Sequence, residues 1–174
     1  MAVPEKRLQE VVDEVYMKEL HRELEDPERL RELYGAPWVD GAWRDRARQI
    51  ATLAKQMIGA ELAEVNLVSD HTMMCIASAD GDERDIDANS SYCQYVVATK
   101  AAVIIHDAQI TRFVQDNPTA RTLRSYVGIP LTHRGRVLGA LCVADREPRN
   151  WTVVEVHLLT QLATTLLSSE GWVA

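Results

Sequence analysis

The segment that decides the fold runs from Ser125 to Asp145 and reads SYVGIPLTHRGRVLGALCVAD. Two apolar runs flank the polar tetrapeptide at 133–136, whose glycine suits the positive φ of a tight hairpin turn. We therefore expect two antiparallel strands. Side chains alternate along a strand, and neither face of the second strand carries a charge over residues 137–144. A strand without a polar face is covered on both sides, so the hairpin predicts a sheet buried between two layers.

Helices are expected on both sides of this hairpin in the chain. Apolar residues recur every three or four positions over 4–25 and 41–58, as on the buried stripe of an amphipathic helix. Asp26-Pro27 predicts the start of a short helix between them, because an N-cap aspartate precedes a first-turn proline. Capping-box patterns, S-x-x-Q from Ser91 and T-x-x-E from Thr152, predict two further helices.

Three more strands are expected at residues 62–69, 73–79 and 103–105, where short apolar runs are bounded by turn residues. Residues 107–123 are irregular, and Asn117-Pro118 excludes a continuous helix there. This order of elements predicts an α+β fold with a central antiparallel sheet. We expect the terminal helices to pack on one face of the sheet, and loops and short helices to form a pocket on the other.

Composition indicates one soluble globular domain and excludes several classes of function. The chain has 174 residues, of which 47% are hydrophobic and 26% charged. No apolar run is long enough for a signal peptide or a membrane span, so we expect a cytoplasmic protein without a membrane partner. The net charge of −7 argues against binding to nucleic acid. Three cysteines without a C-x-x-C pair are expected to be reduced thiols.

Four motifs together resemble a known family. They are SYCQYVV at 91–97, VIIHDA at 103–108, YVGIPL at 126–131 and G-x-x-L-G-x-L-C-V-x-D-x-x-P-R-x-W at 135–151. Over about residues 40–168 the chain is similar to the GAF domains of bacterial signalling proteins. The resemblance implies a GAF- or PAS-like fold for residues 40–170. Residues 1–39 would then be amphipathic helices outside it that serve packing or dimerisation.

The resemblance also implies a function, that of a noncatalytic sensory or regulatory module binding a small molecule in its pocket. Such a module signals through helix packing, as a homodimer, or through a signalling partner protein, when its ligand shifts a conformational population. The motifs do not name the ligand, so the cofactor is unknown. A ligand-free protein-interaction domain, its pocket filled by its own side chains, is an alternative from another class.

Subclasses of the family that carry chemistry differ from this sequence. Residues 108–125 hold no cysteine or histidine for covalent attachment of a bilin, and the N-K-x-F-D-E signature of cyclic-nucleotide-binding members is absent. The cysteine spacing departs from that of the free methionine sulfoxide reductases. A thiol-dependent redox enzyme or redox sensor is the remaining chemical alternative, centred on Cys93 at a helix N-terminus, whose dipole lowers a thiol pKa. Cys75 and Cys142 are expected to be inert.

No spacing of histidine and cysteine matches a metal site. A haem hypothesis rests on His106 alone, and a lone histidine at a strand end is more typical of a hydrogen-bonded structural residue. The candidate pocket wall mixes aromatic and polar groups, as ligand sites do: Tyr92, Cys93, His106, Asp107, Phe113, Asn117 and Tyr126. The alternatives are that these side chains pack on one another and that Asp107 caps the next turn.

The first helix needs a partner for its apolar stripe, because a helix of about 20 residues in isolation is marginal in water. The stripe includes Leu8, Val12, Val15 and Leu20. We expect these four residues to pack against the last helix or against a second copy of the chain in a dimer interface.

Overall fold

The computed structural model of the protein describes residues 5–35 and 41–168, with the backbone alone for residues 5–12. Its helices are α1 (Glu5–Leu24), α2 (Pro27–Tyr34), α3 (Gly41–Ile58), α4 (Cys93–Thr99) and α5 (Val153–Leu167). Its strands are β1 (Leu62–Val68), β2 (Thr72–Ser78), β3 (Ile86–Asp87), β4 (Val103–Ile105), β5 (Ser125–His133) and β6 (Arg136–Asp145). Two short 3-10 helices, η2 (Ala88–Ser90) and η3 (Pro118–Arg121), lie in the connections.

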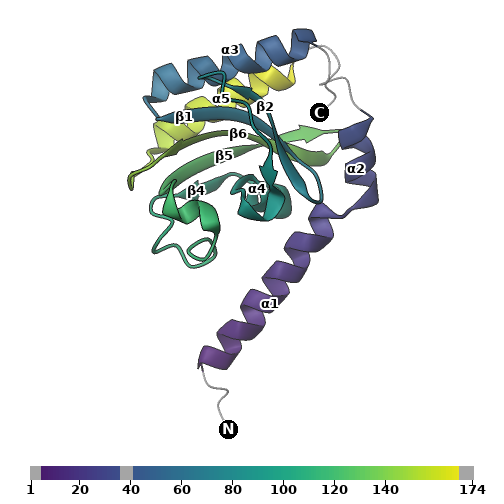
Figure 1. The fold of residues 1–174 in the computed structure, drawn as a ribbon, viewed down its shortest axis with the longest axis vertical. Coiled ribbons are helices and arrows are strands. Elements are labelled where there is room, and N and C mark those ends of the chain that lie inside the picture. The colour runs from purple at the N-terminus through teal and green to yellow at the C-terminus, as the bar shows by residue number, and fades with distance from the viewer. Residues whose placement is uncertain (1–4, 36–40, 169–174) are drawn as a thin grey trace.

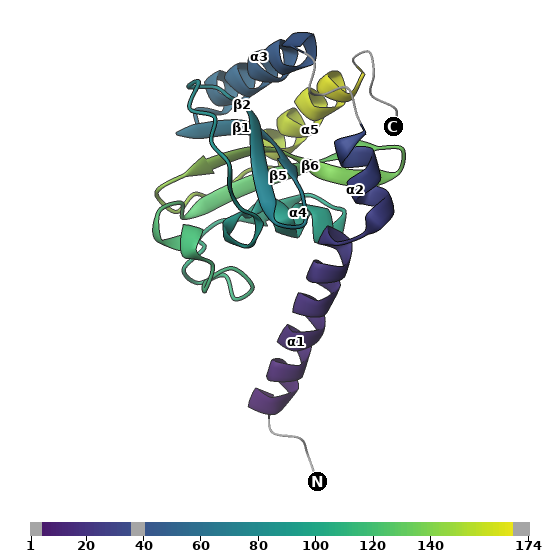
Figure 2. The same cartoon turned by 45° about the vertical axis from the view of Figure 1, so that its right-hand side comes forward.

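The strands form one antiparallel sheet in the order β3-β2-β1-β6-β5-β4, so β6 lies in its interior between β1 and β5. Helices α3 and α5 cover one face, and α4 lies on the other face (Figure 1 and Figure 2). This arrangement confirms the predicted α+β class. Among the described strands, only the two-residue β3 was not expected, because it lies in a charged segment. No helix in the described part of the chain is long and apolar enough to cross a bilayer.

The predicted hairpin is confirmed, with one irregularity. Arg134 and Gly135 form its two-residue turn, and both have positive φ. Alternation along β6 is broken where the register with β5 shifts, because Leu138 is skipped in the pairing and forms a bulge. Leu138 therefore packs in the same apolar cluster as Leu141, although strict alternation places the two on opposite faces.

Gly139 lets strand β1 approach β6 closely. A Cβ atom on residue 139 would lie 1.9 Å from the carbonyl oxygen of Asn66 and 2.7 Å from Cα of Leu67. Both obstacles are backbone atoms, so no rotamer change could relieve the clash. The glycine inside this strand is thus required by a neighbouring strand rather than by a ligand.

The two capping-box patterns have different outcomes. The Thr152 pattern is confirmed, because its hydroxyl accepts from the backbone N of Glu155 and the Glu155 carboxylate accepts from the backbone N of Thr152. The Ser91 pattern is wrong as a capping box, since α4 begins at Cys93 and the Gln94 side chain donates to the carbonyl oxygen of Asn89 in η2 instead. Ser91 Oγ accepts from Cys93 N at 3.0 Å, so the serine still stabilises the start of the helix.

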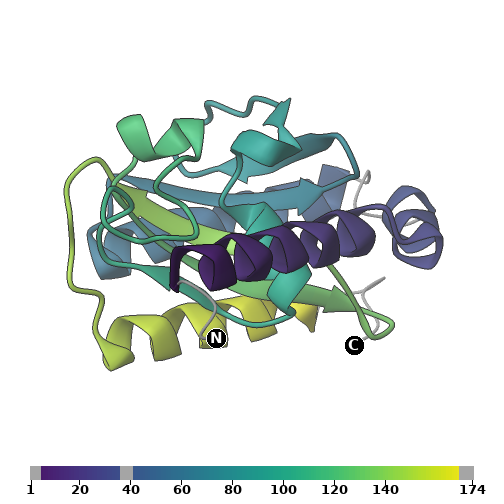
Figure 3. The ribbon, with the colours of Figure 1, turned by 90° about the horizontal axis from the view of Figure 1, so that it is seen from below.

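The amino-terminal helix is not on the face where it was expected. Helix α1 packs against α4, on the side of the sheet opposite α5, and its C-terminal half crosses α4 (Figure 3). The reason is that Leu20 joins the apolar cluster that α4 forms with the sheet. Leu20 is therefore buried within the chain, whereas Val15 is exposed. The side chains of Leu8 and Val12 lie outside the described residues.

A buried arginine holds the corner between α1 and α2 against the sheet. Arg29 Nε donates to the carbonyl oxygen of Glu23 at 2.9 Å, and its two Nη atoms donate to those of Leu24 and Val68 at 2.6 Å each. Only 2% of the residue is exposed, and this burial lowers the pKa of the guanidinium. These charge-assisted bonds connect the end of α1 to the end of β1.

The substitution Arg29→Met should lower the free energy of unfolding by about 2–4 kcal/mol, because it keeps an apolar stem but leaves three carbonyl groups without their donor. Urea unfolding followed by circular dichroism measures the change. Arg31→Met is the matched control, since Arg31 is exposed on the same helix, and its effect should stay below about 0.5 kcal/mol. Equal losses in the two variants would contradict the role given to Arg29.

Candidate functional site

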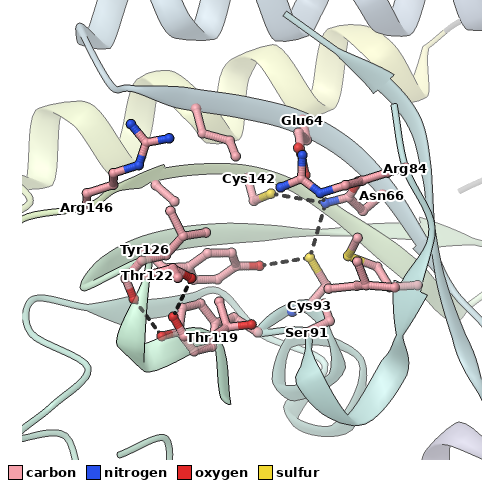
Figure 4. Close-up of a pocket in the computed structure, with 16 residues that line it drawn as sticks. Glu64, Asn66, Arg84, Ser91, Cys93, Thr119, Thr122, Tyr126, Cys142 and Arg146 are labelled. Carbon is pink, nitrogen blue, oxygen red and sulfur yellow. Dashed lines mark hydrogen bonds between the residues drawn. The ribbon is translucent and has the colours of Figure 1, made fainter. Parts of the chain in front are cut away.

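A cavity of about 400 Å³ lies between the sheet and a roof made by the start of α4 and by η3 (Figure 4). Strands β1, β5 and β6 form its floor. Exposed side chains line its rim, among them Arg84, Thr122 and Arg146, so the cavity opens to solvent. Among the residues that the structure describes, no group of three or more potential metal ligands occurs.

Strand β1 places two polar side chains on the cavity floor. Glu64 and Asn66 line the cavity, whereas the residues that alternate with them, Ala63, Val65 and Leu67, belong to the core beneath α3 and α5. Glu64 is 7% exposed and Asn66 is 1% exposed. Burial raises the pKa of Glu64, and the hydrogen bond that Asn66 Nδ2 donates to Glu64 Oε2 at 3.0 Å partly opposes this rise.

Asn66 connects the polar groups of the floor. Besides Glu64, its Nδ2 contacts the sulfur of Cys93 at 3.6 Å and that of Cys142 at 3.5 Å. Its Oδ1 has no hydrogen-bond partner in the described part of the chain. A buried acceptor without a donor costs about 1–3 kcal/mol.

Tyr126 on β5 connects the floor to the roof. Its hydroxyl donates to Cys93 Sγ at 3.3 Å, and its ring meets Tyr92 edge-on with 5.3 Å between the centroids. The ring needs Gly128, because a Cβ atom there would lie 2.1 Å from the Tyr126 hydroxyl oxygen. Tyr92 donates to the carbonyl of Leu123 at 2.7 Å. Burial raises the pKa of both tyrosines, so both are neutral hydroxyl groups.

The residues predicted for the pocket wall do not all meet. Tyr92, Cys93 and Tyr126 come together in the cavity. Phe113 and Asn117 line a separate hollow of about 520 Å³ between α1, α4 and the segment before η3. Phe113 lies at the open side of that hollow, because 45% of the residue is exposed.

His106 and Asp107 line neither hollow. His106 is exposed, and its Nδ1 accepts from the backbone N of Trp151 at 3.1 Å. Asp107 pairs with Arg124 at 2.6 Å and accepts from the backbone N of Gln109, so it caps the following turn. The Arg124 guanidinium holds the pKa of Asp107 below its usual value. His106 is therefore a hydrogen-bonded residue at a strand end, and Asp107 is a turn cap, as the structural alternatives for these two residues predicted. His106 lies outside both hollows, so its position does not support the haem hypothesis.

The cavity floor contains three residues that were not predicted from the sequence to line the pocket, namely Glu64, Asn66 and Cys142. Polar residues that alternate with apolar ones on a strand usually face water. Here the second face of the sheet is roofed by α4 and η3, so the same alternation buries them. The segment LAEVNLV at 62–68 carried the signal, because its polar positions share one face and the pocket was expected on one face of the sheet.

Comparisons with known proteins agree with this fold. The family model of the GAF domain matches residues 42–167. A cyclic di-GMP phosphodiesterase of Pseudomonas aeruginosa is 31% identical over 105 residues, which are 58% of this chain and 18% of that enzyme. The chain therefore spans less than a fifth of the length of this curated relative.

Two solved structures are similar in fold. The GAF domain from an Acinetobacter phosphoenolpyruvate-protein phosphotransferase superposes with a TM-score of 0.60 at 15% identity, over 86% of this chain and 89% of that one. The free methionine-R-sulfoxide reductase from Neisseria meningitidis in complex with its substrate superposes with a TM-score of 0.58 at 18% identity, over 74% and 78%. At these identities the likeness shows the fold alone. Since the family model covers α3 through α5 and the fold agrees, the chain belongs to the GAF domain family.

Proposed function

We propose that this chain is a noncatalytic sensory or regulatory module that binds a small polar molecule in the cavity beneath α4. The observation that carries the proposal is Asn66 Oδ1, a buried acceptor on the cavity floor with no donor among the described residues. Folded proteins pair nearly all such groups, and an unpaired one at a cavity is a position where a ligand donor gains free energy.

The cavity limits the chemistry of this ligand. Glu64 and Asn66 Oδ1 offer hydrogen-bond acceptors at the floor, so the buried end of the ligand carries N–H donors such as those of an amine, amide or amidine. Tyr92 and Tyr126 offer aromatic surface beside these groups. At the rim, Arg84 and Arg146 pair with Asp82 at 2.7 Å and with Glu61 at 3.3 Å, so the rim carries both signs of charge. A volume of about 400 Å³ suits a small metabolite.

The alternative of a ligand-free interaction domain requires a pocket filled by its own side chains. The cavity and its unpaired acceptor favour ligand binding over this alternative. A regulatory role is also supported by the Pseudomonas aeruginosa relative, in which the matching segment is only 18% of a phosphodiesterase. A segment of that size is suited to regulate a neighbouring unit, and the phosphodiesterase activity itself is not assigned to this chain.

The packing of α1 offers a route for the signal. Cys93, at the cavity, is the first residue of α4, and α1 packs directly on α4. A ligand that shifts α4 therefore acts on α1 without a further intermediary, by a change of conformational population.

The first experiment is native mass spectrometry of the full chain, compared with a denatured sample. The native protein should carry a defined additional mass that is lost on denaturation. Thr122→Trp should abolish the additional mass, because Thr122 is exposed at the rim and an indole there obstructs the cavity without overpacking the core.

Thr160→Trp is the matched control, since Thr160 is exposed on α5 over the opposite face of the sheet. It should retain the additional mass. If the wild-type chain carries no additional mass, and a screen of small amines and amino acids by thermal shift also finds no binder, the proposed function is wrong.

Glu64→Gln should raise the free energy of unfolding of the ligand-free protein at pH 8. Because burial raises the pKa of Glu64 above 4.5, the folded protein at pH 8 holds a poorly solvated charge that unfolding returns to water. The gain should shrink as the pH falls toward 4.5, where the wild-type carboxyl is protonated in the folded state. Urea unfolding at several pH values measures it.

Glu61→Gln, at an exposed position close in the sequence, is the control for this series and should change the free energy of unfolding little at any pH. A Glu64→Gln protein less stable than wild type at pH 8 would show that Glu64 is a structural residue. In that case the ionised carboxylate stabilises the fold, and it is not reserved for a ligand.

We also propose that the module is a homodimer that associates through α1. Val15 is 56% exposed on this helix, and in the sequence Leu8 and Val12 precede it at the three- and four-residue spacing of an amphipathic stripe. Val15→Lys should convert the dimer to a monomer in multi-angle light scattering. Val154→Lys, at an exposed valine of α5, should not. A wild-type monomer, or a dimer that persists in Val15→Lys, argues against this interface.

A further inference from the structure

Two cysteines that are 49 positions apart in the sequence meet on the cavity floor. Cys93 begins α4, and Cys142 lies in the middle of β6. The amide Nδ2 of Asn66 contacts both sulfur atoms, at 3.6 Å and 3.5 Å (Figure 4). Both thiols are free in the structure. The tertiary structure thus creates a pair of neighbouring thiols that the sequence spacing does not reveal.

The two thiols have different electrostatic surroundings. The pKa of Cys93 is lowered, first by a hydrogen bond with Cys142 and then by those from Tyr126 and Asn66, against the opposing effect of burial. The pKa of Cys142 is raised well above its usual value by the neighbouring Cys93 and by burial. The thiolate of Cys93 therefore forms more readily than that of Cys142. A nucleophilic thiolate beside a protonated thiol is the arrangement that forms a disulfide in two steps.

The cavity gives small molecules access to the pair. Cys93 and Cys142 are each only 2% exposed, yet both line the cavity, whose rim is open at Thr122 and Arg146. Cys75, in contrast, does not line this cavity, and burial raises its pKa to about 12. The chain therefore contains its own internal control for thiol reactivity.

We propose that Cys93 and Cys142 are a redox-active thiol pair that small hydroperoxides oxidise to an intramolecular disulfide. In the first step the Cys93 thiolate attacks the terminal peroxide oxygen. The O–O bond breaks, the leaving oxygen departs with a proton as water or an alcohol, and Cys93 becomes a sulfenic acid. In the second step the Cys142 sulfur attacks the Cys93 sulfur, and the displaced hydroxyl leaves as water with the proton of Cys142. Two thiols are oxidised by two electrons and one peroxide is reduced.

The disulfide would tether the first residue of α4 to the central strand. Its formation needs no bound ligand, so it is independent of the proposed function. If the ligand-binding experiments above find no ligand, the proposal of a redox-active thiol pair still stands. If no disulfide forms, the proposal of ligand binding still stands.

The test uses the full reduced chain, treated with equimolar hydrogen peroxide and then denatured in N-ethylmaleimide. Intact mass should fall by about 2 Da before labelling, the two hydrogens lost on disulfide formation. Peptide mapping should find Cys93 joined to Cys142, with the maleimide on Cys75. A disulfide that includes Cys75, a disulfide between chains, or three labelled cysteines would each overturn the proposal.

Single substitutions separate the two steps. Cys142→Ser should stop at the sulfenic acid of Cys93, which dimedone traps, and Cys93→Ser should not react at a comparable rate. Cys75→Ser is the matched control and should form the disulfide as the wild type does. If Cys93→Ser consumes peroxide as fast as wild type, Cys93 is not the attacking thiol and the mechanism is wrong.

Tyr126→Phe gives a readout that does not depend on replacing a cysteine. The ring stays in place, but the hydroxyl that donates to Cys93 Sγ is lost. The rate at which iodoacetamide alkylates Cys93 at neutral pH should fall roughly tenfold, and its pH profile should move to higher pH. An unchanged pH profile would mean that this hydrogen bond does not stabilise the Cys93 thiolate.

Discussion

The burial of strand β6 on both faces is the constraint on which the other layers depend. One face packs against the core beneath α3 and α5, with Leu141 and Val143 in that cluster. Beyond Val137, the other face carries small side chains, Ala140, Cys142 and Ala144. These leave room for the cavity, since larger residues there would fill the space between the sheet and α4. Gly139 completes the arrangement because it lets the backbone of β1 come close. The same strand therefore packs into the core with one face and leaves space for the cavity on the other.

The polar floor of the cavity has an energetic cost for the fold. Glu64 and Asn66 are buried, and Asn66 Oδ1 has no hydrogen-bond partner among the described residues. Apolar side chains at these positions would make a more stable domain, because each buried polar group without a full set of partners has a desolvation cost. Under the proposed function a ligand would satisfy these groups, and the surrounding double-sided core supplies the stability that makes such a site tolerable.

The cavity and the amino-terminal helix are neighbours through α4. Cys93 faces the cavity as the first residue of α4, and Leu20 of α1 is buried in the cluster that contains α4. Arg29 fixes the other end of this contact by bonding the end of α1 and the end of β1. A bound molecule and an oxidised thiol pair would both act on the start of α4, so the two inputs would reach α1 through the same packed elements.

The sequence by itself determined the α+β class, the hairpin at 125–145, the long helices and three residues of the cavity, because these follow from local periodicity, turn chemistry and short motifs. Only the tertiary structure decided the side on which α1 packs, the bulge at Leu138 and the burial of Glu64 and Asn66. It also decided the meeting of Cys93 with Cys142. Local patterns show which side chains share a face, but not what covers that face. The contacts between α4 and the central strands join segments far apart in the chain, and no local signal encodes them.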